Sequence, residues 1–144
     1  MADTISPEFH LPTEIYIEQD ISKNSAGIAS KFGHRVIIIT VYTDFEVYQN
    51  TLSEIYKSFK SINIGCIIYD ELPGSPTTED IDMAVSFIKK TKFDLIIGFG
   101  GIESINSAKA IALLTSNHIF CYDALYTDEK LKLPAKFITM PAYP

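Results

Sequence analysis

One stretch of the sequence, residues 93–114, constrains the fold more than any other. It opens with a short, continuous apolar run, Leu95 to Ile97, of the kind found in a strand that is buried on both faces of a parallel sheet. Three glycines follow at once, and from Ser104 the apolar residues recur at the spacing of a helix. A strand, a glycine turn and a helix in this order bring backbone N–H groups and a helix N-terminus against a phosphate.

The glycine spacing in this stretch differs from the common nucleotide-binding motifs. The segment G-F-G-G-I-E lacks the third glycine of G-x-G-x-x-G, and it is not G-x-x-x-x-G-K-[ST] either. A glycine-rich turn is also typical of any tight connection in an open sheet. The turn alone therefore leaves both interpretations open, a phosphate cradle and a plain turn.

Apolar runs and helical patterns alternate along the whole chain. The expected strands are Pro12–Ile17, Val36–Thr40, Ile64–Tyr69, Leu95–Ile97 and Phe137–Met140. The expected helices start near Asp20, Asp44, Thr77 or Thr78, and Ser104, and the first of them is stopped by Gly33. This alternation predicts an α/β fold, a Rossmann-like layered domain with a mostly parallel sheet and helices on both faces. Ligands of such sheets bind at the carboxyl ends of the strands.

Length and composition bound the remaining possibilities. A chain of 144 residues predicts one domain, which we divide into a leader, 1–11, and an α/β nucleotide-binding domain, 12–144. The net charge of −6 and the absence of a basic patch argue against nucleic acid as a partner. No apolar run approaches the roughly 20 residues that span a bilayer, so we expect no membrane segment. Cys66 and Cys121 form no C-x-x-C motif, and without a secretory signal we expect a cytoplasmic protein.

Several of these segments together resemble one family. Their order is PTEIYI from Pro12, VIIIT from Val36, the triplet Ser75-Pro76-Thr77, the segment from Gly100 to Lys109, and the residues from Pro141 to Pro144. They are similar to the nucleotide-binding half of the iron-containing alcohol dehydrogenases, whose wider group includes glycerol dehydrogenase and dehydroquinate synthase. The glycine segment, which resembles the family's G-G-G-S-x-x-D-x-A-K, carries most of the weight.

The resemblance implies a function and a set of site residues. It implies an oxidoreductase that transfers hydride between NAD or NADP and an alcohol or carbonyl substrate, with a divalent metal, Fe or Zn. The cofactor-binding positions that it implies are Gly100, Gly101, Ile102, Glu103, Asn106, Thr40, Val41 and Pro141. The first four of these would act through their backbones, while Thr40 and Val41 would lie near the adenosine.

The sequence departs from the family's pattern at several of these positions. Ile102 stands at the third glycine, where a β-branched residue disfavours positive φ and crowds a phosphate. Glu103 replaces the family's serine, and its carboxylate either opposes the pyrophosphate or serves as a favourable acid at the helix N-terminus. Asn106 replaces the family's Asp and loses its charge. Val41 stands where many relatives have an acid, so the choice between NAD and NADP remains open.

The metal site of the family has no counterpart in the sequence. The resemblance places the metal ligands, one Asp and three His, in a C-terminal helical domain beyond the matched part. His10, His34 and His118 show no ligand spacing, so we expect no metal ligand and no catalytic residue in this chain, and only weak or lost dinucleotide binding. We expect the missing C-terminal domain as a partner, whether the chain is an expressed fragment or a natural truncation. A homodimer is also expected, with the strand at residues 14–17 as a pairing edge.

Two other interpretations stay open. The chain could be a stand-alone binding or interaction module of the same fold with a degenerate nucleotide site, which Ile102 and Glu103 favour. It could also be a flavodoxin-like or sugar-phosphate-binding α/β domain whose resemblance to the dehydrogenases is accidental.

Overall fold

Four parallel strands form a single sheet at the centre of the protein. The computed structural model describes residues 8–142, and its strands follow the order β2-β1-β3-β4. The strands are β1 (Arg35–Val41), β2 (Gly65–Leu72), β3 (Leu95–Gly100) and β4 (Phe137–Pro141). The helices are α1 (Ile21–Ala29), α2 (Glu46–Ser61), α3 (Thr78–Thr91), α4 (Ile102–Thr115) and the short α5 (Cys121–Ala124). The predicted α/β class with a parallel sheet is confirmed.

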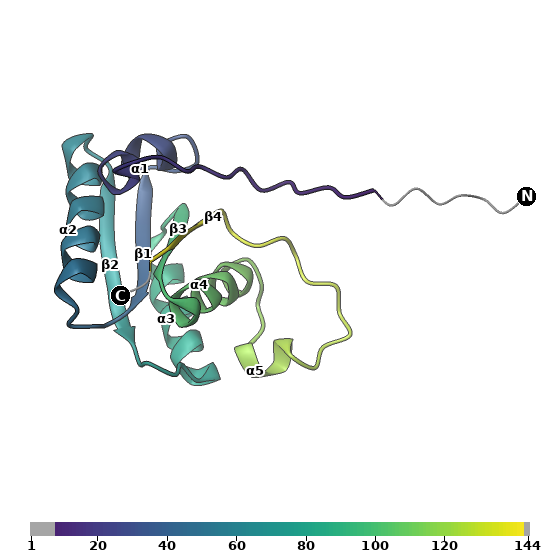
Figure 1. Cartoon of the computed structure of the whole chain (residues 1–144). Helices are drawn as coiled ribbons and strands as arrows, with labels where there is room; N and C mark the ends of the chain where they lie inside the picture. The colour runs from purple at the N-terminus through teal and green to yellow at the C-terminus, as the bar shows by residue number, and fades with distance from the viewer. Residues whose placement is uncertain (1–7, 143–144) are drawn as a thin grey trace, which may run out of the picture.

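The sheet separates two hydrophobic cores, one on each face. Helices α1 and α2 cover one face, and α3 and α4 cover the other (Figure 1). Alternate residues of β1 divide between the two cores, Ile38 facing α2 and Ile37 facing α3 and α4. Every residue of β3 is buried, as the continuous apolar run predicts. The helices on both faces complete the layered Rossmann-like arrangement.

Helix α3 begins where the sequence indicates. Thr77 is its N-cap: the Thr77 hydroxyl accepts from the Asp80 N–H at 3.3 Å, and the Asp80 carboxylate accepts from the Thr77 N–H at 2.8 Å. This capping box satisfies two backbone donors that the helix cannot satisfy itself. The helix ends at Lys92, which adopts a left-handed conformation with φ of 56°. Local residues therefore fix both ends of α3.

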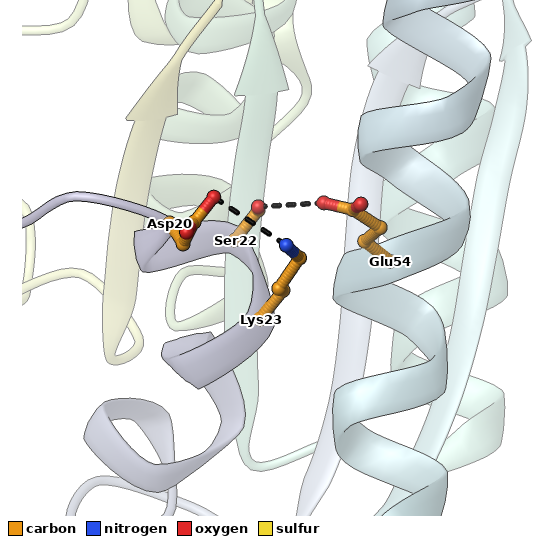
Figure 2. Close-up of polar contacts among 4 residues, drawn as sticks. All are labelled: Asp20, Ser22, Lys23 and Glu54. Carbon is orange, nitrogen blue, oxygen red and sulfur yellow. Dashed lines mark hydrogen bonds and ion pairs between the residues drawn. The ribbon is translucent and has the colours of Figure 1, made fainter.

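Polar contacts join α1 to α2. The Ser22 hydroxyl donates to the Glu54 carboxylate at 2.8 Å, while Asp20 pairs with Lys23 at 3.5 Å instead of capping α1 (Figure 2). Deeper in the interface the hydroxyls of Ser25 and Ser58 lie 3.1 Å apart. Small residues at this contact let the two helices pack closely before the chain enters β1.

The predicted strand Pro12–Ile17 is wrong for the described structure. Residues 12–17 form no helix or strand and run away from the body of the protein (Figure 1). The side chains of Ile15 and Ile17 are 68% and 90% exposed. A strand needs a partner for its N–H and C=O groups, and no strand of the described part pairs with this segment. The predicted leader, 1–11, lies partly outside the described residues.

Three predicted helix boundaries also need correction. Helix α1 ends at Ala29, with Ser30 as its C-cap, rather than at Gly33. Gly33 is needed for another reason, because a Cβ added there would lie 2.5 Å from the Asp94 carboxylate. Helix α2 begins after Phe45 and not at Asp44, and no side chain caps it. Helix α4 begins two residues earlier than Ser104, with Gly101 as its N-cap.

The segment between α4 and β4 is irregular but anchored at one buried side chain. The Asn117 amide donates to the carbonyls of Leu113 and Lys132, at 2.7 and 3.2 Å, and its oxygen accepts from the Lys132 N–H at 2.9 Å. The Ala135 N–H then donates to the Ala112 carbonyl. These bonds guide the chain back to the sheet, where β4 pairs with β3.

Candidate nucleotide-binding turn

The glycine turn lies at the point where the order of the strands reverses. From β1 the chain moves to one side to form β2 and then to the other side to form β3. The carboxyl ends of β1 and β3 are therefore neighbours whose connections diverge, which is where open α/β sheets bind ligands. β4 reaches the same edge, with Pro141 opposite Gly100 and the Ala142 N–H donating to the Gly100 carbonyl at 3.0 Å.

Two glycines let the backbone pass closely at this edge. Gly100 adopts a φ of 126°, a conformation that residues with a Cβ rarely adopt. Gly98 lies under α4, where an added Cβ would come within 2.6 Å of the Ala108 Cβ. The two glycines therefore allow the start of α4 to rest directly on the end of β3.

The first turn of α4 leaves its backbone donors available. The first bond of the helix runs from the Ile105 N–H to the Gly101 carbonyl at 3.1 Å. The N–H groups of residues 102–104 precede that bond, so they have no carbonyl acceptor within the helix. The N-cap, Gly101, brings no side chain, and no side-chain capping bond is formed. The helix dipole adds partial positive charge at the same place, so this end of α4 fits an anionic group such as a phosphate.

Most of the predicted cofactor residues meet at this turn. Thr40 is buried at the end of β1, and the Val41 N–H donates to the Ser104 hydroxyl at 2.9 Å, which ties β1 to α4. Pro141 flanks Gly100 on the other side. Ile102 is 65% exposed over the turn. Asn106 lies one helical turn further along α4, exposed and apart from the others.

Glu103 lies in the open first turn of α4. Its side chain is exposed, and one carboxylate oxygen lies 3.4 Å from the place that a Cβ on Gly101 would occupy. The carboxylate therefore folds over the glycine turn. It interacts favourably with the helix dipole, but it also stands where a phosphate would approach.

Charge is divided between the two edges of the sheet. Acidic residues occupy the first turns of three helices that begin at the carboxyl edge, Glu46 in α2, Glu79 and Asp80 in α3, and Glu103 in α4. Basic residues occupy the last turns at the amino edge, Lys60 in α2 and Lys89 and Lys90 in α3. Within residues 8–142 no Lys or Arg lies in the loops that follow β1, β2 and β3. A cofactor phosphate at this edge would thus be bound by backbone groups and not by cationic side chains.

The described residues do not fit a catalytic metal. Within 8–142 no group of three or more His, Cys, Asp or Glu side chains is arranged to hold an ion. The thiol of Cys66 is buried, and burial raises its pKa to about 12, so it stays protonated and weakly nucleophilic at neutral pH. Over the same described residues, no helix combines the length and the apolar character needed to cross a membrane.

Two residues that contact the turn are not among the predicted site residues. Ser104, expected as a cap, is buried, and its hydroxyl bonds β1 as described above. Tyr48 of α2 is not among the predicted site residues, and its hydroxyl donates to the Phe99 carbonyl at 3.0 Å. The one sequence signal for this contact is the tyrosine hydroxyl, because a buried tyrosine oxygen needs a polar partner.

Comparisons with known proteins agree with this geometry. The sequence model of the iron-containing alcohol dehydrogenase family matches residues 12–144. A curated relative, the mitochondrial hydroxyacid-oxoacid transhydrogenase of Caenorhabditis elegans, is 34% identical over 71 residues, which are 48% of this chain and 15% of the relative.

Solved structures of the same kind superpose on most of the chain. An iron-containing alcohol dehydrogenase from Thermotoga maritima gives a TM-score of 0.80 at 26% identity, covering 93% of this chain and 37% of its own. The NADH-dependent butanol dehydrogenase A of the same organism gives 0.81 at 19% identity, with coverages of 93% and 34%. The sulfoacetaldehyde reductase of Bifidobacterium kashiwanohense, solved with NAD+, gives 0.79 at 17% identity, with coverages of 93% and 35%. The chain thus spans about a third of the length of these structures.

Proposed function

Because the chain belongs to the iron-containing alcohol dehydrogenase family, we propose that it supplies the nucleotide-binding half of an oxidoreductase. The proposed reaction is hydride transfer between NAD(P) and an alcohol–carbonyl pair. The observation that carries the proposal is the open first turn of α4 beside Gly100, at the reversal of strand order. The match over 12–144 removes the alternative of a flavodoxin-like domain with an accidental resemblance.

The part of this chain in the reaction is to bind and orient the dinucleotide. The N–H groups at the start of α4 would bind the pyrophosphate, and the end of β1 at Thr40 and Val41 would lie near the adenosine. When bound, the cofactor accepts or supplies the hydride. The divalent metal does not fit the described residues, so we propose that its ligands belong to the part of the family's length that this chain does not cover.

Binding by this chain alone is proposed to be weak. Backbone groups are the phosphate ligands, while Glu103 and the other acids at the carboxyl edge oppose an anion. NADP(H), with its additional phosphate, should meet more repulsion than NAD(H).

The test is a titration of the ¹⁵N-labelled chain with NADH, followed by amide resonances. We expect shifts confined to Val41 and residues 100–104, with a dissociation constant above the micromolar range. Amides at the amino edge, such as that of Lys92, serve as the internal control and should not move. Absence of shifts at millimolar NADH would contradict the proposal, and a sub-micromolar constant would contradict the claim of weak binding.

A stand-alone module with a degenerate nucleotide site is the second candidate. The specific observation in its favour is Ile102, exposed over the turn at the position of the family's third glycine. This candidate predicts no response to either dinucleotide until Ile102 is replaced by glycine. The same titration therefore separates the two functions.

Assembly and location are also proposals. We expect a homodimer or the family's remaining domain as the partner, since the extended segment around Ile15 and Ile17 leaves apolar side chains exposed. A monomer mass from light scattering at high concentration would contradict self-association. A cytoplasmic location stays a prediction, and the two nematode relatives are named as mitochondrial proteins.

A further inference from the structure

A buried tyrosine hydroxyl lies directly beneath the glycine turn. Tyr48 comes from the first half of α2 and is 5% exposed. Its hydroxyl donates to the Phe99 carbonyl at 3.0 Å and lies 2.5 Å from the Thr40 hydroxyl. Because its single hydrogen goes to Phe99, the tyrosine oxygen accepts the hydrogen of Thr40. The hydroxyl therefore links the ends of β1 and β3, the two strands that flank the proposed site.

Tyr48 packs so closely against Gly100 that no larger residue fits at position 100. A Cβ on Gly100 would collide with the Tyr48 hydroxyl and would lie 3.1 Å from its Cζ atom. The same Cβ would also lie 2.9 Å from the Ser104 hydroxyl oxygen. Tyr48 thus occupies the space that a side chain at position 100 would take. The unusual φ of Gly100 and the tyrosine ring form one packed unit.

Packing alone does not require the hydroxyl. The rings of Tyr48 and Phe99 pack at a centroid distance of 4.7 Å, and a phenylalanine would keep that contact. A buried hydroxyl is costly unless both its hydrogen and its oxygen are satisfied. Here both are satisfied by groups at the carboxyl edge of the sheet, and one of them is the peptide carbonyl that immediately precedes Gly100.

Ser104 completes the arrangement from the side of the helix. Its hydroxyl accepts from the Val41 N–H, so the first turn of α4 is attached to β1 by one bond, while Tyr48 attaches the end of β3 to the same strand. Together these bonds set the direction in which the N–H groups of residues 101–104 point. None of the donors to a phosphate would need to contact Tyr48 itself.

We propose that Tyr48 is a positioning residue for the pyrophosphate-binding turn, acting through Phe99 and Gly100 without touching the ligand. The proposal rests on the proposed function, because it assigns a role at that same site. It distinguishes this hydroxyl from those that only fill the core. A purely structural tyrosine would affect stability and leave the affinity for a diphosphate unchanged.

The test compares the variant Tyr48→Phe with the unchanged chain, using NADH, ADP and adenosine as probes. We expect about tenfold weaker binding of the two diphosphate ligands, no change for adenosine, and altered amide resonances at residues 100–104. The matched control is Tyr69→Phe, which removes the hydroxyl of a tyrosine whose ring packs in the opposite core. The control should bind all three ligands as the unchanged chain does.

A second variant separates positioning from stability. Tyr48→Phe leaves the Thr40 hydroxyl with only the long bond to the Val41 carbonyl, at 3.4 Å, and the double variant Thr40→Val, Tyr48→Phe removes that weakly bonded group. We expect the double variant to recover thermal stability but not diphosphate affinity. Recovery of both, or equal losses for adenosine and NADH, would overturn the role of Tyr48. If the unchanged chain does not respond to NADH at all, the proposed function fails first, and this inference fails with it.

Discussion

Side chains bond the backbone N–H groups near Asp94 at the amino edge of the sheet, but not those at the start of α4 at the carboxyl edge. At the amino edge the Asp94 carboxylate accepts from the N–H groups of His34 and Arg35, the latter at 2.8 Å, and the Arg35 side chain donates to the Thr91 carbonyl. At the carboxyl edge the first turn of α4 has neither a side-chain cap nor an intrahelical acceptor. The difference indicates that the amino edge closes the fold, while at the carboxyl edge the start of α4, unlike the capped start of α3, keeps donors available for a ligand.

Replacing Gly100 by alanine should produce the largest effect, because it breaks the close packing of the carboxyl edge. An alanine would keep a strained φ and collide with the Tyr48 hydroxyl. Strain and overpacking together should lower the free energy of unfolding by about 4 kcal/mol. Urea denaturation measures this change. The control is Gly27→Ala in α1, where nothing lies near the added Cβ, and it should stabilise slightly.

Replacing Asn117 by alanine should disturb the amino edge and spare the site. The variant loses three hydrogen bonds of a buried side chain and leaves the Lys132 N–H without its acceptor. We expect a loss of about 2 to 3 kcal/mol in the free energy of unfolding. The exposed Asn50→Ala is the control and should change it by less than about 0.5 kcal/mol. Altered NADH shifts at the start of α4 would contradict the separation of the two edges.

Cys66, near the amino end of β2, should make the stability depend on alkaline pH. Burial raises the pKa of its thiol from 9.0 to about 12, with Lys60 acting in the opposite direction. Between these values the unfolded chain releases the proton and the folded chain keeps it, so stability is full below pH 9 and falls as the pH rises towards 12. We expect Cys66→Ala to flatten this fall by up to about 1 kcal/mol per pH unit. Equal slopes for both proteins would contradict the buried, protonated thiol.

Replacing Glu103 by serine should give the smallest change in free energy, and this change should appear directly in the affinity for the ligand. Removing the carboxylate beside the glycine turn should favour a diphosphate by about 1 kcal/mol after screening, or roughly fivefold in affinity. The gain should shrink as the salt concentration rises. If Ile102 is the main obstacle, Glu103→Ser alone leaves affinity unchanged, and only adding Ile102→Gly improves it. Fluorescence titration with NADH at two salt concentrations distinguishes these outcomes.

The layered fold could be predicted because its signals are local. The β-branched run in β1, the apolar run in β3 and the Thr77–Asp80 pair act within a few residues of one another. The prediction of a strand at Pro12–Ile17 was wrong because a strand forms only beside a partner strand. The alternation of apolar and polar residues in this segment does not show whether such a partner exists.

The site could be predicted only in outline. The glycines located the turn, and Thr40, Val41 and Pro141 were brought to it by parallel strands that end at one edge. The bond from Tyr48 to Phe99 joins residues 51 positions apart, and a tyrosine hydroxyl does not alter the helical periodicity of the apolar residues in α2. The bond from the Val41 N–H to the Ser104 hydroxyl could not be predicted either, because a serine near the start of a helix is equally typical of an ordinary cap.

The burial of β3 bears on how rigidly the glycine turn at its end is held. β1 and β3 are the interior strands, each paired on both sides, whereas β2 and β4 are the edges. Amide hydrogens in such strands exchange with solvent through global unfolding rather than through local fraying. We therefore expect the turn to rest on strands whose amides exchange slowly, so that a ligand would meet a surface that is already formed before it arrives.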